Sequence, residues 1–233
     1  MVIVVALVAS LLWTPDRDRA SLEALSLRSP ADMVDVAGTR LDVRDSGPKD
    51  APAVLLLHGF GASLYTWEDW AGPLSVDHRV IRLDLPGCGL SPPDPTGDYT
   101  GAHSIAVLIA LMDPLGVAKA SVVGNSMGGR IAWTFAAEHP ERVDRLVLIS
   151  PDGFASPGFE YGVRPDGPAT VKAMRYVLPK PLVKMRLAPT LLLWSEEDRM
   201  IPFRNAADDR KTIPGAKRVP LPGVGHLPQE EAP

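Results

Sequence analysis

Short apolar runs alternate with helix-like stretches along most of this chain. Runs of four to seven apolar residues bounded by turn residues are typical of buried strands, and apolar positions repeating every three to four residues are typical of helices. The alternation predicts an α/β fold with a doubly wound, mostly parallel sheet of eight strands. The expected strands are 33–36, 41–44, 53–57, 79–83, 120–123, 145–149, 190–194 and 218–221, and the expected helices are 64–74, 103–115, 129–138 and 204–211.

The first two strands read as an antiparallel hairpin around Ala37 and Gly38, and the later strands are expected to be parallel. In such sheets the ligand site lies beyond the carboxyl ends of the strands. The residues that follow the apolar runs are therefore candidates for chemistry. They are His58, Asp84, Ser126, Asp152, Asp198 and His226.

The segment Gly124-Asn125-Ser126-Met127-Gly128 lies between an apolar run and a helix-like stretch. A strand that turns sharply into a helix crowds its own backbone, and glycines two before and two after the serine remove the side chains that would collide. Such a turn exposes a hydroxyl at the sheet edge. A serine hydroxyl needs a histidine to accept its proton and an acid to orient that histidine.

These motifs, in this order, resemble the α/β-hydrolase fold family, here its serine esterases and lipases, over residues 33–233. The matching stretches are the HGFG loop, DLPGCGLS, the GNSMGG elbow, WSEEDRMIP and GVGHLPQEE. The resemblance implies a nucleophile at Ser126, an acid at Asp198 and a base at His226. It also implies an oxyanion hole formed by the backbone N–H groups of Phe60 and Met127.

Several alternatives stay open at this point. A chance GxSxG match is conceivable in a chain with 20 glycines. The acid could instead be Asp152, because some family members supply it after the preceding strand, and Ser195 stands where the family pattern has a glycine before the acid. Phe60 could simply line the core.

The interval 153–188 is where this family inserts its cap, and here it is short. Apolar positions across 171–178 face one way and basic ones the other, which is typical of a cap helix over a pocket or of a helix on a lipid surface. Family members usually carry more cap helices and a closing helix after the histidine. We therefore expect a reduced cap and no closing helix. Both absences are typical of a trimmed or incomplete chain.

The amino-terminal segment 1–20 differs from the rest. Residues 2–13 are almost all apolar and are followed by a charged stretch, but the run is shorter than the roughly 20 residues that span a bilayer. This pattern favours the remnant of a signal peptide or membrane anchor over a buried or interfacial helix. An exported or membrane-attached protein is thus expected, with a cytoplasmic one as the alternative.

Composition narrows the classes of function. The net charge is −4 and the basic residues are scattered, which argues against nucleic acid as a partner. Cys88 is the only cysteine, so an internal disulfide and a multi-cysteine zinc site are excluded, and the five histidines form no close HxxxH-type pair. No cofactor and no metal are expected. Nothing in the sequence fixes the oligomeric state.

Three functions compete. The leading hypothesis is a serine hydrolase that cleaves a small-molecule carboxylic ester through an acyl-enzyme. A carbon–carbon bond hydrolase of the meta-cleavage-product type is the second, because GNSMGG also resembles that group, although Leu227 stands where those enzymes commonly have tryptophan. The third is a non-catalytic binding member of the fold. Epoxide hydrolases and dehalogenases of this fold use an aspartate nucleophile, which Ser126 does not match.

Overall fold

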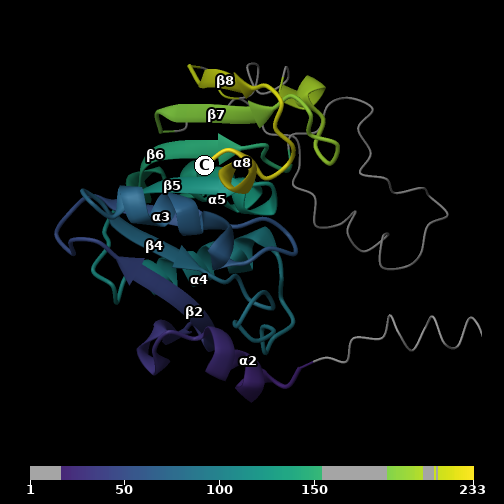
Figure 1. Ribbon diagram of the computed structural model, residues 1–233. Helices are drawn as coiled ribbons and strands as arrows, with labels where there is room; N and C mark the ends of the chain where they lie inside the picture. The colour runs from purple at the N-terminus through teal and green to yellow at the C-terminus, as the bar shows by residue number, and fades with distance from the viewer. Residues whose placement is uncertain (1–16, 154–187, 207–212, 214) are drawn as a thin grey trace, which may run out of the picture.

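A computed structural model describes residues 17–153, 188–206, 213 and 215–233 (Figure 1). Eight strands form one sheet in the order β1-β2-β4-β3-β5-β6-β7-β8. The pairs β1·β2 and β2·β4 are antiparallel, and every later pair is parallel. The predicted α/β fold with a mostly parallel sheet is therefore confirmed.

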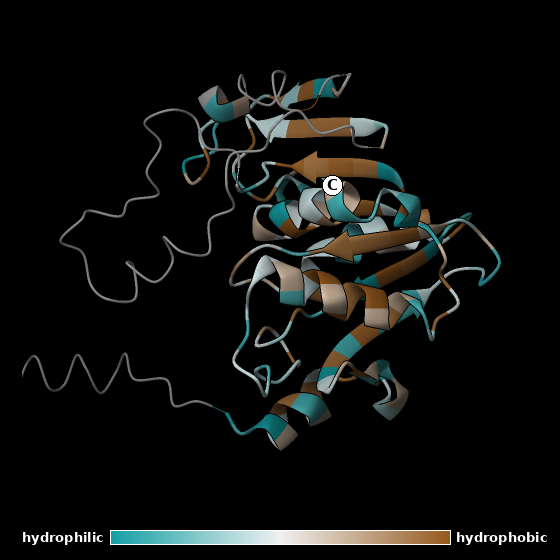
Figure 2. Ribbon diagram, turned by 180° about the vertical axis from the view of Figure 1, so that it is seen from behind, coloured by the Kyte–Doolittle hydropathy of each residue, from teal (hydrophilic) through white to brown (hydrophobic). Residues whose placement is uncertain are grey.

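The strands lie close to their predicted positions. They are β1 (Met33–Val36), β2 (Thr39–Ser46), β3 (Ala53–Leu57), β4 (Arg79–Leu83), β5 (Ala120–Asn125), β6 (Val143–Ile149), β7 (Thr190–Ser195) and β8 (Lys217–Leu221). Most differences are one or two residues at the ends. The parallel strands are nearly continuous apolar runs because helices cover both faces of the sheet, as the brown strands of Figure 2 show.

Alternate residues of each central strand face different helices. Leu55, Leu57 and Ile81 belong to the larger core cluster, which includes α4 (Gly101–Met112) and α5 (Met127–Glu138). Val54, Leu56 and Val80 belong to the second cluster, with Trp67 of η2 (Leu64–Trp67) and Ala71 of α3 (Glu68–Leu74). The two-residue period of the strands therefore supports two hydrophobic layers, one on each face of the sheet. Parallel pairing places the carboxyl ends of β3, β5 and β6 side by side.

The helices differ more from the prediction than the strands do. The expected helix 64–74 is a 3-10 turn, η2, followed by α3, and the 103–115 helix begins and ends earlier, as α4. The stretch 204–211 lies largely outside the described residues; the described part contains the 3-10 turn η4 (Phe203–Asn205). A further 3-10 turn, η3 (Pro140–Arg142), precedes β6. Almost all of the expected cap, including 171–178, lies outside the described residues.

Three elements near the chain ends were not predicted. Helix α2 (Arg19–Ser26) and the 3-10 turn η1 (Pro30–Asp32) precede β1, and α2 is capped by the Asp18 side chain, which accepts from Ser21 N–H. A short helix, α8 (Pro228–Glu231), follows His226, so the expectation of no closing helix was wrong. Its Glu231 carboxylate accepts hydrogen bonds from the N–H groups of Gly225 and Leu227, which folds the chain back into a turn.

No helix within residues 17–153, 188–206 and 215–233 is long and apolar enough to cross a bilayer.

Candidate active site

Ser126 lies at the sharp turn between β5 and α5. Its backbone has φ 52° and ψ −117°, a conformation that non-glycine residues rarely adopt. A Cβ at Gly124 would lie 2.3 Å from the carbonyl oxygen of Gly128, and one at Gly128 would lie 2.2 Å from that of Leu57. The two glycines are thus required for the approach of α5 to β5 and β3, which is the reason the sequence analysis gave for the motif.

Backbone hydrogen bonds hold the turn in place. The Ser126 N–H donates to Ile149 C=O at 3.1 Å, and the Ser126 carbonyl accepts from the N–H groups of Arg130 and Asp152 at 3.0 and 2.9 Å. These contacts join the turn to the end of β6 on one side and to the first turn of α5 on the other. The strained residue is therefore fixed by its surroundings.

The HGFG loop passes directly beside this turn. A Cβ at Gly59 would lie 3.2 Å from the Ser126 Cβ and 3.1 Å from the Asn125 Oδ1. The close approach brings the backbone that follows Gly59 next to the serine. The Phe60 side chain is 80% exposed, so the alternative in which it lines the core is wrong.

Buried polar groups set the course of the HGFG loop. The Leu85 N–H donates to His58 Nε2 at 3.0 Å, so the ring proton is on Nδ1, which lies 2.7 Å from the Gly59 carbonyl oxygen. Burial lowers the pKa of His58 and favours this neutral form. The His58 ring thus links Gly59 of the HGFG loop to Leu85, in the loop after β4.

Asp84 joins the start of η2, just after the HGFG loop, to the loop after β4. One carboxylate oxygen accepts from Leu64 N–H and the other from Leu90 N–H, both at 2.7 Å. Burial raises the pKa of Asp84. The two hydrogen bonds lower it, but burial has the larger effect and the net pKa lies above its usual value. Burial also raises the pKa of the nearby Cys88 thiol, and the Asp84 charge adds to the effect, so this thiol is a poor nucleophile.

Asp198 and His226 lie in the loops that follow β7 and β8. The His226 Nδ1 is 2.8 Å from the Asp198 Oδ2, while the Asp198 Oδ1 accepts from the N–H groups of Met200 and Ile201 at 2.9 and 2.8 Å. Burial raises the pKa of Asp198, but the hydrogen bonds from His226 and Ile201 outweigh it, and the net pKa lies below its usual value. The carboxylate therefore stays ionised opposite the imidazole.

Asp152, the alternative acid, has a different environment. Its Oδ2 lies 3.7 Å from Arg130 Nε, and its backbone carbonyl accepts from Trp133 Nε1 at 3.0 Å. Burial raises the pKa of Asp152, and the charges of Arg130 and His226 oppose the rise. The imidazole hydrogen bond goes to Asp198, so the geometry favours Asp198 as the acid.

Two residues near His226 were missed by the sequence analysis. Asn125, the second residue of the elbow motif, donates from Nδ2 to His226 C=O at 3.1 Å and to Ile149 C=O at 3.2 Å. Glu231 accepts from the N–H groups on both sides of His226. A polar residue at the variable position of the motif was the available signal for Asn125; a carboxylate five residues after the histidine was the signal for Glu231.

Within the residues that the structure describes, no three His, Cys, Asp or Glu side chains gather in a way that could hold a metal ion.

Comparison with known proteins identifies the family. The family model described as the alpha/beta hydrolase fold matches residues 52–180, more than half of the chain. The chain therefore belongs to the α/β-hydrolase family. This membership, together with relatives that are themselves named hydrolases, supports a hydrolase.

One curated relative is the dihydrolipoyllysine-residue acetyltransferase component of the acetoin cleaving system of Cupriavidus necator. The two sequences are 41% identical over 122 residues, which is 52% of this chain and 32% of that protein. It is 39% identical over 123 residues to 2-hydroxymuconate semialdehyde hydrolase of Pseudomonas putida, covering 52% of this chain and 43% of that enzyme. The matched stretch spans less than half the length of either relative.

One solved structure matches over the whole chain. It is described as a membrane phospholipase A, a novel bacterial virulence factor, with a TM-score of 0.76 and 26% identity, and the match covers 100% of this chain and 92% of that one.

Proposed function

We propose that this chain is a serine hydrolase that cleaves carboxylic esters through an acyl-enzyme. The observation that carries the proposal is the 2.8 Å hydrogen bond between His226 Nδ1 and Asp198 Oδ2, at the sheet edge where the strained turn presents Ser126. A fixed Nδ1–H leaves Nε2 as the ring nitrogen available to accept a proton.

In the proposed reaction, Ser126 Oγ attacks the ester carbonyl while His226 Nε2 accepts its proton. The ionised Asp198 stabilises the imidazolium that forms. The oxygen that becomes negative is bound by the N–H groups of Phe60 and Met127, and one such donor typically lowers the barrier by about 3 to 4 kcal/mol. The imidazolium then protonates the leaving alcohol, and water releases the acid by the same steps.

One finding supports attack on a carbonyl group in general, and a second supports ester chemistry. The loop that carries Phe60 approaches the serine turn closely, as an oxyanion hole requires. The solved structure that matches the whole chain is described as a phospholipase A, a name that denotes cleavage of a carboxylic ester.

Hydrolysis of p-nitrophenyl butyrate by the purified chain tests the proposal. We expect an initial burst of p-nitrophenol and continued turnover, both abolished by Ser126→Ala. A wild-type rate no greater than that of Ser126→Ala would overturn it and would leave the carbon–carbon bond hydrolase and the non-catalytic binding protein as the alternatives.

A carbon–carbon bond hydrolase is the second candidate, because several relatives are named as hydrolases of this kind. The same residues would serve, with a substrate carbonyl next to a carbon leaving group. Consumption of 2-hydroxymuconate semialdehyde, followed by absorbance and compared with ester turnover by the same preparation, distinguishes the two. A kcat/KM for the semialdehyde well above that for esters would favour the second candidate.

A further inference from the structure

Exposed apolar side chains are concentrated at one edge of the sheet. Among the described residues, six large apolar side chains are exposed, and five belong to segments at the carboxyl ends of the strands or to α2, which is attached there. These five, here called the apolar rim, are Leu25, Phe60, Tyr65, Tyr99 and Met200, with exposures of 68, 80, 39, 51 and 66%. The sixth, Val76, is 79% exposed between α3 and β4, at the opposite edge.

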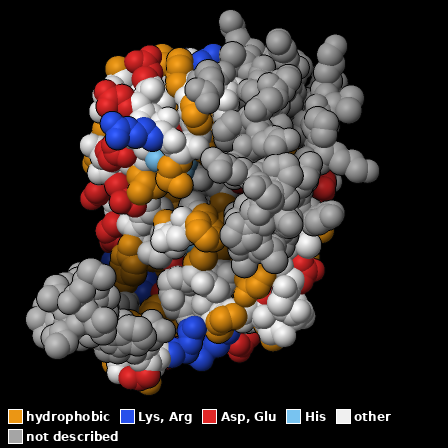
Figure 3. Space-filling view, turned by 90° about the vertical axis from the view of Figure 1, so that its right-hand side faces the viewer, with side chains coloured by type: hydrophobic (Ala, Val, Ile, Leu, Met, Phe, Trp, Pro, Cys, Tyr) orange, Lys and Arg blue, Asp and Glu red, His pale blue; other side chains and the backbone are white. Residues whose placement is uncertain are grey.

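The rim borders the candidate active site. Phe60 belongs to the HGFG loop, and the Met200 N–H donates to the triad carboxylate of Asp198. The Tyr99 ring lies against Gly87, in the loop after β4. Figure 3 views the molecule from this side and shows hydrophobic side chains gathered across the middle of the face. A concentration of exposed apolar side chains on one face marks an interaction surface.

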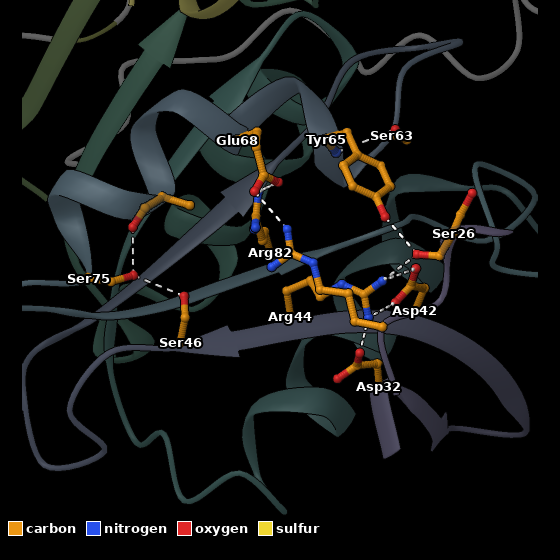
Figure 4. Close-up of polar contacts among 12 residues, drawn as sticks. Ser26, Asp32, Asp42, Arg44, Ser46, Ser63, Tyr65, Glu68, Ser75 and Arg82 are labelled. Atoms are coloured by element: carbon orange, nitrogen blue, oxygen red, sulfur yellow. Dashed lines mark hydrogen bonds and ion pairs between the residues drawn. The ribbon is translucent and has the colours of Figure 1, made fainter. Parts of the chain in front are cut away.

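Helix α2 is fixed to the same edge by polar contacts at its carboxyl end. Ser26 C=O accepts from Tyr65 Oη at 2.8 Å and from an Arg44 guanidinium nitrogen at 3.3 Å (Figure 4). Just beyond the helix, Arg28 pairs with Glu68 at 2.8 Å, and Glu68 also pairs with the buried Arg82 at 2.6 Å. The helix is thus joined to the segment that follows the HGFG loop.

The amino-terminal end of α2 is also held at this edge. Arg19 donates to the carbonyl of Leu90, in the loop after β4. The chain enters the folded part here, directly after the apolar residues 2–13, with Arg17 and Arg19 between them and the helix. An apolar segment followed by the exposed Arg17 suits a bilayer surface, where a guanidinium group meets lipid phosphates.

We propose that the carboxyl edge of the sheet rests on a lipid surface, with the apolar rim in the interface. Tyr65 and Tyr99 suit this depth because each exposes part of an apolar ring while its hydroxyl bonds to the protein backbone. The proposed ester hydrolase would then take its substrates from the bilayer, as acyl esters of membrane lipids. This last step rests on the proposed function; the orientation does not.

The orientation can be measured without turnover. In a full-length Cys88→Ser background, single cysteines at Leu25→Cys, Met200→Cys and Val76→Cys are labelled with a nitrobenzoxadiazole fluorophore and mixed with phosphatidylcholine vesicles. We expect a blue shift and an intensity increase of at least about twofold at positions 25 and 200, and little change at 76. Val76→Cys is the matched control because it is equally exposed and apolar.

Equal responses at all three positions, or no response at 25 and 200, would overturn the orientation. A response at 25 and 200 that appears without vesicles, as the protein concentration rises, would identify a second copy of this chain as the occupant instead.

A second experiment measures turnover of a lipid substrate and of a soluble one. Leu25→Asp is expected to lower the release of fatty acid from phosphatidylcholine vesicles at least about tenfold relative to Val76→Asp, because a charge in the rim opposes insertion. Both variants should cleave soluble p-nitrophenyl butyrate like the wild type. An equal loss of both activities would overturn the interfacial role of Leu25, whereas wild-type inactivity on both substrates would sink the proposed function and leave the fluorescence result standing.

Discussion

Asn125 Nδ2 lies 3.1 Å from the carbonyl oxygen of His226, so the residue before the proposed nucleophile is bonded to the residue that supplies the proposed base. The same side chain also bonds to Ile149 C=O, at the end of β6. A single amide therefore joins the carboxyl ends of β5 and β6 to the loop after β8. Asn125 is fully buried, so its geometry does not depend on surface contacts.

Replacing this amide should release the His226 loop. We expect Asn125→Ala to lower kcat for p-nitrophenyl butyrate on the order of 10- to 100-fold with little change in KM, because the base is displaced from the serine. Ser121→Ala, at the other end of β5, is the control and should leave kcat within about twofold. Equal kcat in the two variants would show that the Asn125 bond does not position His226.

The identity of the acid can be decided by neutral isosteres. Asp198→Asn should lower kcat/KM on the order of 10³- to 10⁴-fold, because the amide cannot stabilise an imidazolium and favours the wrong tautomer. Asp152→Asn should cost less than about tenfold, since the Asp152 carboxylate faces Arg130. The reverse ranking in steady-state kinetics would identify Asp152 as the acid.

The glycines of the turn differ from other glycines in their tolerance of a methyl group. Gly128→Ala should destabilise the fold by more than about 4 kcal/mol or prevent soluble expression, because its Cβ would overlap backbone atoms of β3. Gly101→Ala, at the first residue of α4 with nothing within 4 Å of its Cβ, should stabilise by about 0.5 to 1 kcal/mol. Thermal denaturation of both variants checks the pair; a Gly128→Ala protein that melts like the wild type would contradict the packing.

Two aspartates of β2 should give pH dependences of opposite sign. Burial, opposed by Arg44, raises the pKa of Asp42 from 3.8 to about 6. The folded state then binds this proton more tightly than the unfolded state, so the contribution to stability is full below pH 3.8 and is lost as pH rises through about 6. Asp42→Asn does not titrate, and its melting temperature minus that of the wild type should increase from pH 4 to pH 7.

Asp45 is the control for this experiment. Burial raises its pKa, but hydrogen bonds from Arg79 and Lys49 outweigh burial and the net pKa lies below 3.8. Its stabilising contribution is present above 3.8 and is lost as pH falls through the folded pKa. The melting temperature of Asp45→Asn minus that of the wild type should therefore decrease as pH rises from 3 to 5. Slopes of the same sign for the two variants would refute the assigned environments.

The sequence predicted the sheet well because each buried strand is a short apolar run whose length and boundaries are set locally. Ser126 and its glycines were readable for the same reason, since one turn requires all three residues. The alternation of strands and helices also placed Asp198 and His226 at the correct edge, as the order of elements in a doubly wound sheet dictates.

Contacts between distant segments could not be read in this way. Helix α2 has eight residues and none of them is buried, and it is held by Tyr65 and Arg44, which are far from it in sequence. The turn before the closing helix α8 depends on the Glu231 carboxylate, which accepts hydrogen bonds from the backbone on both sides of His226. In the sequence, Glu231 is not distinguishable from the neighbouring Glu230. The contrast between Asp198 and Asp152 arises from Arg130 and His226, which only the folded chain brings together.

The order of strands in the sheet has a consequence for how the proposed site is assembled. Strands β3, β4 and β5 and the serine turn come from the first 130 residues, whereas the proposed acid and base follow β7 and β8, the two strands at one side of the sheet. The central strands alone therefore position the proposed nucleophile. The proposed proton relay is complete only when β7 and β8 have paired with the sheet beside them during folding.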